Sequence, residues 1–464
     1  MSRRPAIDGD GLPAIAVPPP GPRSRAAAAR LRRSEGGAIW GNGPPPIVWK
    51  RAKGSVVEDL DGNRFLDLTS GFGAASLGHA APEVARAVAA QARRLMQGLG
   101  DLQPHVTRER LVRALAKRGG ALSSVLLATT GSEAVDLALK TAALATGRRR
   151  FVAFEGGYHG QLGLALEATD LPPSPAIVKA GGDPRAIHIA YPDPFRCPLR
   201  RGCAACDLSC FEEGWKRVES ACDGPDPPGA VIVEPIQGRA GVIVPPPRFL
   251  ARLATRARER GLVVIHDEIL TGAGRTGTWW AGEGSGPEAA PDLLVAGKGL
   301  GGGVAIAALF GSPRLMNVWN GHRAKGGEAP YASTYYAHPL AAAGAFAALR
   351  ALDATAEAAG AAASAFTEGL ARLRRLPGVG DVRQAGLLIG IDFVSDASAR
   401  TPHPLLASRV VEGLLRRGVL GLPGGRFAHV VTLLPSRRIA PGQVAFAARA
   451  LEESIGEGAK LSAG

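Results

Sequence analysis

Two short apolar runs, each ending in a charged side chain, constrain this chain more than any other feature. The first covers residues 262–268 and ends in Asp267-Glu268, and the second covers residues 293–298 and ends in Lys298. Aliphatic and β-branched runs of this length are typical of buried strands in a parallel sheet. In an open α/β sheet, ligands bind at the carboxyl ends of the strands. We therefore expect Asp267 and Lys298 to hold opposite sides of one flat ligand.

An acid and an amine in this arrangement suit pyridoxal phosphate. A lysine can form a Schiff base with the aldehyde of this cofactor, and an acidic partner keeps its ring nitrogen protonated, so that the ring accepts electrons. Asp267 needs such a partner, because a lone buried carboxylate is costly. After a substrate amine displaces it, Lys298 can move a proton between the substrate carbon and cofactor carbon C4′. The alternative is an ordinary surface lysine after a strand, which the Gly-Lys-Gly setting of Lys298 disfavours.

The segment around the acid resembles a known family. Residues 266–277 are His-Asp-Glu-Ile-Leu-Thr-Gly-Ala-Gly-Arg-Thr-Gly, and with Lys298 after them they are similar to the class III (ω-type) aminotransferases, which are pyridoxal-phosphate enzymes of fold type I. The resemblance runs from about Trp49 to the C-terminus. It implies an α/β fold with a large domain around a mostly parallel central sheet and a smaller α+β domain built from both chain ends.

Local composition and the resemblance together predict the domain boundaries. Residues 1–35 are rich in Pro, Arg and Ala, which predicts a mostly disordered arm with a short helix through the alanines. We expect residues 36–95 to begin the small domain, with a β-hairpin at 54–68. Residues 96–338 should form the large domain, and residues 339–464 a crossover helix and the rest of the small domain.

Short apolar runs alternate with helical patterns through the large domain, as in a doubly wound sheet. The expected strands are Val125–Ala128, Phe151–Phe154, Ala230–Glu234, Leu262–Asp267, Leu293–Gly297 and Ala305–Phe310.

Bulk properties argue against two classes of protein. The net charge of +14 and the pI of 10.1 permit nucleic-acid binding. However, the basic residues are scattered and no aromatic platform or nucleic-acid motif accompanies them, so we expect no nucleic-acid partner. No apolar run is long enough to span a bilayer, and the N-terminus has no apolar signal core. We expect a cytoplasmic protein without a membrane partner.

Two further strand ends offer contacts to the cofactor. Gly131 and Ser132 open a helix after a strand, and free amides at a helix start bind phosphate well. An ordinary capped helix start is the alternative. Tyr158 follows the next strand and can stack on the pyridine ring, as the resemblance implies, or serve as a structural tyrosine in a glycine-rich turn. His159 beside it is expected to support the site.

The resemblance implies roles for three more residues. The Val-Glu-Pro-Ile-Gln-Gly segment at 233–238 is similar to the family's Glu-Pro-Val-Gln-Gly. It implies that Glu234 lies near the catalytic centre and Gln237 near the phenolic oxygen of the cofactor; the alternative for Glu234 is a strand-end cap. Thr334 would reach the phosphate in a neighbouring subunit, which implies a homodimer with composite sites.

The substrate side departs from the family pattern. Many members place an arginine ahead of a Pro-Pro-Leu near the C-terminus, where it clamps the substrate carboxylate. Here Thr432 occupies that place. Arg426, slightly upstream, is a candidate for a mobile arginine or else a loop residue. Phe72 and Trp49 are candidate walls of the substrate pocket.

Four closely spaced cysteines form a second departure. Cys197, Cys203, Cys206 and Cys210 have a spacing that could hold zinc or an iron–sulfur cluster. The alternative, which we favour, is reduced thiols in a surface insertion and no metal. A disulfide is not expected in the cytoplasm.

Taken together, these features predict an aminotransferase that moves an amino group from an amine or ω-amino donor to a 2-oxo acid such as pyruvate or 2-oxoglutarate. A racemase, epimerase or aminomutase of the same fold and lysine is the alternative. A metal- or nucleic-acid-binding protein on a retired enzyme fold is a third possibility, which the intact Lys298, Asp267, Ser132 and Tyr158 argue against.

Overall fold

The computed structural model describes residues 7–39, 41, 46–172, 174–180, 184–197, 199, 206–323 and 329–463. The chain forms two compact units. The first unit consists of residues 1–81 and 357–464, and the second of residues 82–356.

The second unit is built on a seven-stranded sheet in the order β4-β10-β9-β8-β7-β5-β6. All neighbouring pairs are parallel except those of β10, which runs antiparallel to both β4 and β9. The strands are β4 (Ser124–Ala128), β5 (Arg150–Phe154), β6 (Ala186–Ile189), β7 (Pro228–Val233), β8 (Val263–Asp267), β9 (Leu293–Ala296) and β10 (Ala307–Gly311). The mostly parallel sheet predicted from the sequence is therefore confirmed, with β6 as a strand that the prediction omitted.

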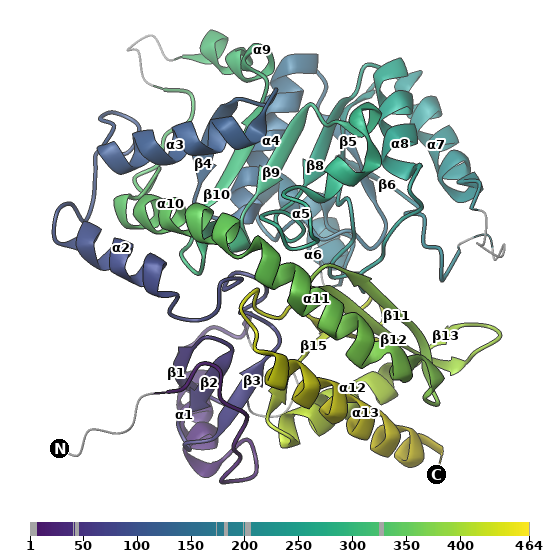
Figure 1. Ribbon diagram of the computed structural model, residues 1–464. Helices are drawn as coiled ribbons and strands as arrows, with labels where there is room; N and C mark the ends of the chain where they lie inside the picture. Colours follow the sequence, from purple (N-terminus) through teal and green to yellow (C-terminus); the bar gives the residue numbers. More distant parts are fainter. Residues whose placement is uncertain are drawn as a thin grey trace. The chain divides into compact units, whose positions relative to one another are not determined.

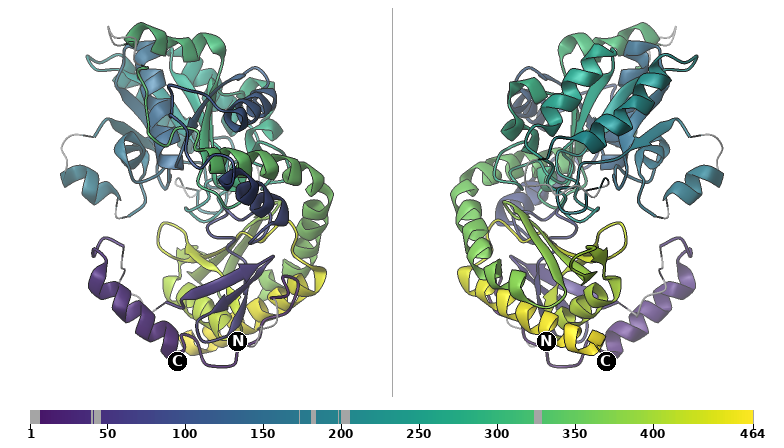
Figure 2. Two further views of the ribbon diagram at one scale, coloured as in Figure 1. Left: turned by 90° about the vertical axis from the view of Figure 1, so that its left-hand side faces the viewer. Right: turned by 90° about the vertical axis from the view of Figure 1, so that its right-hand side faces the viewer.

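Helices cover both faces of this sheet, because its central strands are buried on both sides. One face packs on α4 and α5. The other face packs on α3 and α10 towards β4 and on α7 and α8 towards β6 (Figure 1). The side views of Figure 2 show α3 and α4 on opposite sides of the sheet. The helices are α2 (Pro82–Ala92), α3 (Val106–Gly119), α4 (Gly131–Thr146), α5 (Gly163–Ala168), α6 (Ser174–Ala180), α7 (Ser209–Cys222), α8 (Phe249–Glu259), α9 (Pro313–Met316) and α10 (Pro339–Ala354).

The first unit combines two antiparallel-rich sheets with four helices. One sheet has the order β1-β2-β3-β14 and the other β11-β12-β16-β15, with β13 paired to β12. Its apolar core lies between the second sheet and helices α11, α12 and α13. The elements are α1 (Pro22–Ser34), β1 (Trp49–Lys53), β2 (Val56–Asp59), β3 (Arg64–Asp67), α11 (Ala356–Leu370), β11 (Val379–Ala385), β12 (Leu388–Asp396), β13 (Thr401–Pro402), α12 (Pro404–Arg416), β14 (Val419–Leu420), β15 (Leu422–Gly424), β16 (Val430–Leu433) and α13 (Pro441–Ala463). The predicted hairpin is confirmed as the antiparallel pair β2–β3.

The N-terminal segment, for which we expected a mostly disordered arm, is held by the hairpin. Ala14 pairs with Arg64 through two backbone hydrogen bonds of 2.8 and 3.0 Å. The carboxylate of Asp61 accepts the N–H groups of Arg23 and Ser24 at 2.8 and 2.9 Å. These bonds satisfy amides at the start of α1 that have no partner inside the helix. Local composition does not reveal such contacts, because the partners lie about forty residues away.

The division into units differs from the expected domain boundaries at two points. We expected the large domain to span residues 96–338, whereas the second unit begins at residue 82 and ends at residue 356. The reason is that α2 and α10 pack against one another within the second unit. The predicted crossover helix is also two helices, α10 and α11. Over the described ranges, no helix is both long and apolar enough to cross a membrane.

Candidate active site

The acid and the amine singled out from the sequence lie at the ends of adjacent strands. Asp267 is the last residue of β8 and pairs with Val295 of the neighbouring β9. Lys298 follows β9 after Gly297 and opens a short 3₁₀ turn, Lys298–Gly301. Its φ of 43° lies in the left-handed region, which non-glycine residues rarely adopt. Backbone strain of this kind persists where the surrounding structure imposes it, and it concentrates at functional sites.

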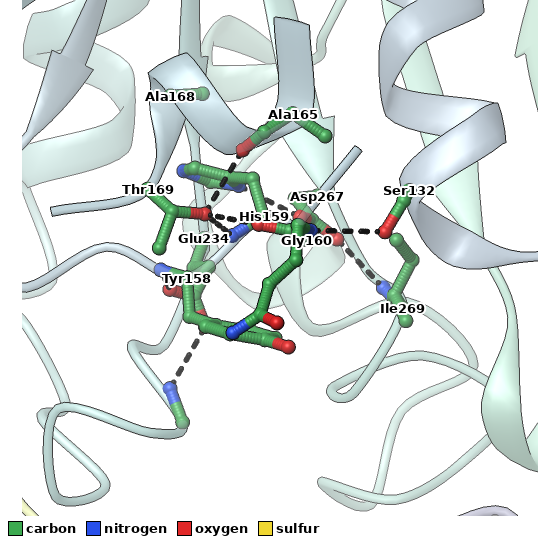
Figure 3. Close-up of polar contacts among 12 residues, drawn as sticks. Ser132, Tyr158, His159, Gly160, Ala165, Ala168, Thr169, Glu234, Asp267 and Ile269 are labelled. Carbon is green, nitrogen blue, oxygen red and sulfur yellow. Dashed lines mark hydrogen bonds and ion pairs between the residues drawn. The ribbon is translucent and has the colours of Figure 1, made fainter. Parts of the chain in front are cut away.

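A buried histidine holds the aspartate. His159 Nδ1 lies 2.7 Å from Asp267 Oδ2, and both side chains are almost fully buried (Figure 3). The other carboxylate oxygen of Asp267 accepts the N–H of Ile269 at 3.0 Å. Burial opposes the charged imidazole, but the hydrogen bond and charge of Asp267, with the charge of Glu234, raise the pKa of His159 above its ordinary value. The hydrogen bond to Asp267 therefore favours the protonated ring of His159.

Lys298 is in an environment that favours its neutral amine. Burial is the main cause and lowers its pKa, because a charged ammonium loses hydration. The carboxylates of Asp267 and Glu234 oppose this effect, whereas the guanidinium groups of Arg239 and Arg275 add to it. A lysine with a lowered pKa is a better nucleophile and a better base near neutral pH.

The start of α4 forms a cradle suited to phosphate. Thr130 caps this helix by accepting the N–H of Glu133. Gly131 and Ser132 occupy the first turn, whose amides have no partner inside the helix. Ser132 Oγ accepts the N–H of Gln161 at 3.2 Å, which joins the cradle to the loop after β5.

The loop after β7 ties Tyr158 to the same region. Glu234 accepts the N–H of Tyr158 at 2.9 Å with one carboxylate oxygen and the N–H of Gly238 at 2.9 Å with the other. Burial and the charge of Asp267 raise the pKa of Glu234, while His159 and the two amides oppose the shift. Both carboxylate oxygens of Glu234 therefore hold backbone amides in place.

Gln237 is placed to receive one more hydrogen bond. Its Nε2 donates to the carbonyl of Glu155 at 3.0 Å, and its buried Oε1 has no partner within the described residues. An unpartnered buried acceptor indicates a missing donor at this position.

Several residues that the sequence analysis did not single out lie at this edge of the sheet. Arg239 stands over the ring of Tyr158, with 4.8 Å between its guanidinium carbon and the ring centroid. Thr169 accepts the N–H of His159 at 2.9 Å and so fixes its backbone. Glu133 on α4 accepts the hydroxyl of Tyr331. No local pattern indicates these contacts, because each joins segments far apart in the chain or depends on the path of a loop.

Thr334, predicted to reach a neighbouring subunit, lies on an exposed part of the second unit. Its carbonyl accepts Gln97 Nε2 at 2.7 Å, and His105 Nε2 lies 2.8 Å from the carbonyl of Ala337. The loop before α3 therefore supports the segment that carries Thr334.

The four residues considered for substrate recognition all belong to the first unit. Trp49 packs edge-on against His79, with 5.6 Å between ring centroids. Phe72 is 62% exposed and, like Lys298, has a left-handed backbone, with φ of 58°. Arg426 is exposed. Thr432 lies in β16, and its buried hydroxyl has no partner in the part of the chain that the structure describes.

The cysteine cluster is only partly described, since Cys203 lies outside the described residues. Cys197, Cys206 and Cys210 are free thiols. Burial, with the nearby Cys197 and Cys206, raises the pKa of Cys210 to about 11, which disfavours the thiolate. Among the described residues, no group of three or more His, Cys, Asp or Glu side chains is arranged to hold a metal ion.

Comparison with known proteins begins with the fold. An amine transaminase from an uncultivated Pseudomonas species, solved with bound pyridoxal phosphate, superposes with a TM-score of 0.81 and 27% identity, covering 91% of this chain and 98% of the other. The fold is thus that of the fold type I pyridoxal-phosphate enzymes, as expected from the sequence.

The family follows from sequence. A family model described as Aminotransferase class-III matches residues 40–455. The chain is 33% identical to a 4-aminobutyrate aminotransferase of Mycobacterium leprae, over 94% of this chain and 97% of the relative. It is also 29% identical to an alanine/serine racemase of Pyrococcus horikoshii, over 96% of this chain and 93% of the relative. The chain belongs to the class III aminotransferases, and its cofactor is pyridoxal phosphate.

The residues at the sheet edge fit this cofactor. The buried carboxylate of Asp267 suits a protonated pyridine nitrogen, and the first turn of α4 offers amides to a phosphate. The unpartnered oxygen of Gln237 and the amine of Lys298 are available for further polar contacts.

Replacing Gly160 by alanine should weaken cofactor binding about 10- to 100-fold, the loss typical of a hydrogen bond to a charged group. A Cβ at this position would lie 2.2 Å from Ser132 Oγ and 3.0 Å from Ser132 Cα, so the start of α4 must shift. Titration of the apoenzyme with pyridoxal phosphate measures the effect. Both glycines have a positive φ, 131° at Gly160 and 71° at Gly147. Gly147→Ala is the matched control, because no atom apart from its chain neighbours lies within 4 Å of the place where its Cβ would be. Equal affinity in Gly160→Ala and wild type would contradict this account of the cradle.

Glu268→Gln should make thermal stability less sensitive to pH. Burial raises the pKa of Glu268 to about 7, against hydrogen bonds from Thr271 and Gly282 that favour the charged form. Between pH 4.5 and 7 the unfolded chain releases a proton that the folded chain keeps, so stability falls as pH rises through this window. Glu268→Gln lacks this loss of folding stability, which is about 3 kcal/mol for a pKa shift of this size.

Calorimetry at pH 5, 6, 7 and 8 tests this expectation. The Tm of Glu268→Gln should rise relative to wild type over this range and level off near pH 8. The exposed Glu283 serves as a control. The Tm difference between Glu283→Gln and wild type should not change with pH. A Tm difference for Glu268→Gln that does not change with pH would show that the carboxyl is not perturbed.

Proposed function

We propose that the enzyme transfers an amino group from an amine or ω-amino donor to a 2-oxo acid such as pyruvate or 2-oxoglutarate, with Lys298 as the catalytic amine. One observation carries the assignment of residues: Lys298, in a left-handed backbone after β9, adjoins the end of β8, where Asp267 is paired with buried His159. An amine of lowered pKa beside a buried carboxylic side chain is the pair that this chemistry needs.

In this proposal each residue has a defined task. Pyridoxal phosphate, when bound, supplies the aldehyde that takes up the amino group and the ring that withdraws electrons from the substrate carbon. Lys298 Nζ anchors the cofactor and then carries a proton away from the substrate carbon and returns it to the cofactor. Asp267 keeps the ring nitrogen protonated, and His159 holds the Asp267 carboxylate in position.

The remaining cofactor contacts orient the ring. Gly131 and Ser132 bind the phosphate through the first turn of α4, and Tyr158 stacks on the pyridine. Gln237 contacts the phenolic oxygen. Glu234 contributes by positioning Tyr158 and by its charge near Lys298, which fits its two bonds to backbone amides.

The substrate side of the proposal involves the first unit. We assign Phe72 and Trp49 as pocket walls. The resemblance suggests Arg426 as a mobile cation. Thr432 stands where many family members carry the arginine that clamps the substrate α-carboxylate. The lack of this arginine agrees with an amine or ω-amino donor rather than an α-amino acid.

The proposal includes a cytoplasmic homodimer in which Thr334 reaches the phosphate of the neighbouring subunit. Support comes from a group of large, exposed apolar side chains around the loop before α3 and the segment beside Thr334. We call it the loop patch: Leu95, Met96, Leu99, Leu102, Val106 and Tyr335 are 39–70% exposed. Such groups mark association surfaces in proteins of this size.

Leu102 is the most exposed side chain of the loop patch, and Leu102→Glu should weaken the dimer. Burying a charge in an apolar interface without a partner is unfavourable, so we expect at least a tenfold rise in the dissociation constant, measured by sedimentation. Leu461→Glu, at an exposed leucine of α13, is the control. A wild-type protein that sediments as a monomer would refute the homodimer.

A racemase is the second candidate, because a relative with that name matches over nearly the whole chain. Here Lys298 would remove and return the proton at one substrate carbon, and the substrate would keep its nitrogen. The two candidates differ in an observable way: only transamination leaves the amino group on the cofactor when no oxo acid is present.

Mixing the holoenzyme with a panel of amines, without an oxo acid, tests the function. We expect loss of the visible absorbance, and chromatography of the denatured protein should recover pyridoxamine phosphate. Lys298→Ala should slow this conversion by about 10²- to 10⁴-fold, the usual contribution of a general base. Lys117→Ala, at an exposed lysine of α3, should behave as wild type. Racemised substrate without pyridoxamine phosphate would favour the second candidate.

A further inference from the structure

We infer that Arg239 is the residue of the second unit that recognises a carboxylate group of the substrate. This inference rests on the proposed function and deepens it, because it names the substrate class: amines and oxo acids that carry a carboxylate. Arg239 stands over the ring of Tyr158, and its side chain is exposed. Within the described residues, its guanidinium has no ion pair or hydrogen bond, so its donors are available.

The charge of Arg239 acts on the catalytic amine. Its guanidinium acts on Lys298 through space and, after burial, contributes to the lowered pKa of that amine. Arg275 acts in the same direction, but its side chain is only 3% exposed and has other contacts. Arg239 is therefore the exposed one of the two cations that affect Lys298.

The backbone that carries Arg239 is rigid. Gln237 and Ile243 exchange two backbone hydrogen bonds of 3.1 and 2.9 Å, which close the loop at its base. Gly238 is bound by the carboxylate of Glu234, and Ala240 is 5% exposed. A rigid loop that presents an arginine with free donors resembles a preorganised anion site, since little order is lost when the anion binds.

The chemistry of arginine favours a carboxylate as its partner. Guanidinium presents two parallel N–H groups that match the two oxygens of a carboxylate. Its contact with Tyr158 is a cation–π interaction at an exposed position, which is weaker than a charge-assisted bidentate pair. A substrate carboxylate can therefore draw Arg239 away from the aromatic face, whereas an uncharged substrate leaves it there.

Thr432 in the first unit leaves the carboxylate clamp of the family without its arginine. Its hydroxyl can offer one hydrogen bond but no charge, and it stands where the resemblance led us to expect an arginine. A carboxylate bound without that arginine needs another cation. Arg239 is an exposed cation whose charge acts on Lys298.

Matched pairs of amines test the assignment on the holoenzyme. Each ω-amino carboxylate of three to six carbons is compared with the alkylamine of the same length, and the rate of loss of cofactor absorbance is followed against concentration. Arg239→Gln should raise the half-saturating concentration of each carboxylate about 10- to 100-fold more than that of the alkylamine of the same length, because any effect through Lys298 is common to both. Arg239→Lys should lie between wild type and Arg239→Gln, because the charge remains but the bidentate geometry is lost.

Two comparison variants complete the design. Arg314→Gln removes the same charge at an exposed position beyond β10, at the opposite edge of the sheet, and should change neither class of amine. Equal losses for carboxylates and alkylamines in Arg239→Gln would overturn the inference, because they indicate a general disturbance of the site. Selective loss in Arg426→Gln with an unaffected Arg239→Gln would also overturn it.

A second readout separates this inference from the proposed function. Calorimetric titration of the holoenzyme with butanoate and pentanoate, which have no amino group, measures carboxylate binding without any reaction. We expect binding to wild type that weakens at least tenfold in Arg239→Gln. If no amine converts the cofactor, transamination fails, yet the titration still decides the role of Arg239. Absence of butanoate and pentanoate binding to wild type would overturn the inference alone.

Discussion

The buried ion pair between His159 and Asp267 is the interaction on which the rest of the site depends. Each side chain is costly to bury alone, and each is stabilised by the other across 2.7 Å. Because His159 lies in the loop after β5 and Asp267 ends β8, the pair holds two strand ends in one arrangement. That arrangement also sets the positions of Tyr158 and Gly160, which flank the histidine (Figure 3).

The carboxylates and guanidinium groups at this edge of the sheet act on Lys298 in opposite directions. Asp267 and Glu234 favour protonated neighbours, while Arg239 and Arg275 oppose a charge on Lys298. Desolvation has the largest effect on the pKa of Lys298. The two carboxylates raise this pKa, but not back to its ordinary value. A site built this way places a carboxylic side chain near an amine of lowered pKa, and burial and charge act on that amine together.

The sequence predicted what depends on neighbouring residues. Short aliphatic runs located the strands that end near Asp267 and Lys298, and the fold class followed. The ion pair of His159 was not predicted, because its partner is 108 residues away. β6 was missed because His188 interrupts its short apolar run, Ala-Ile-His-Ile. The contact of Arg239 with Tyr158 depends on the path of a loop, which no local pattern specifies.

The N-terminal segment shows that the limits of a family match and of a folding unit can differ. The match begins at residue 40, yet residues before it complete the first unit. The fully buried Gln443 donates to the carbonyls of Gly9 and Gly11 at 3.2 and 2.9 Å, and Ile7 is itself buried. Shortening the chain to the matched region would remove both acceptors of this amide group, a loss of about 1–3 kcal/mol. Residues outside the match to the family model are thus part of this protein's interior.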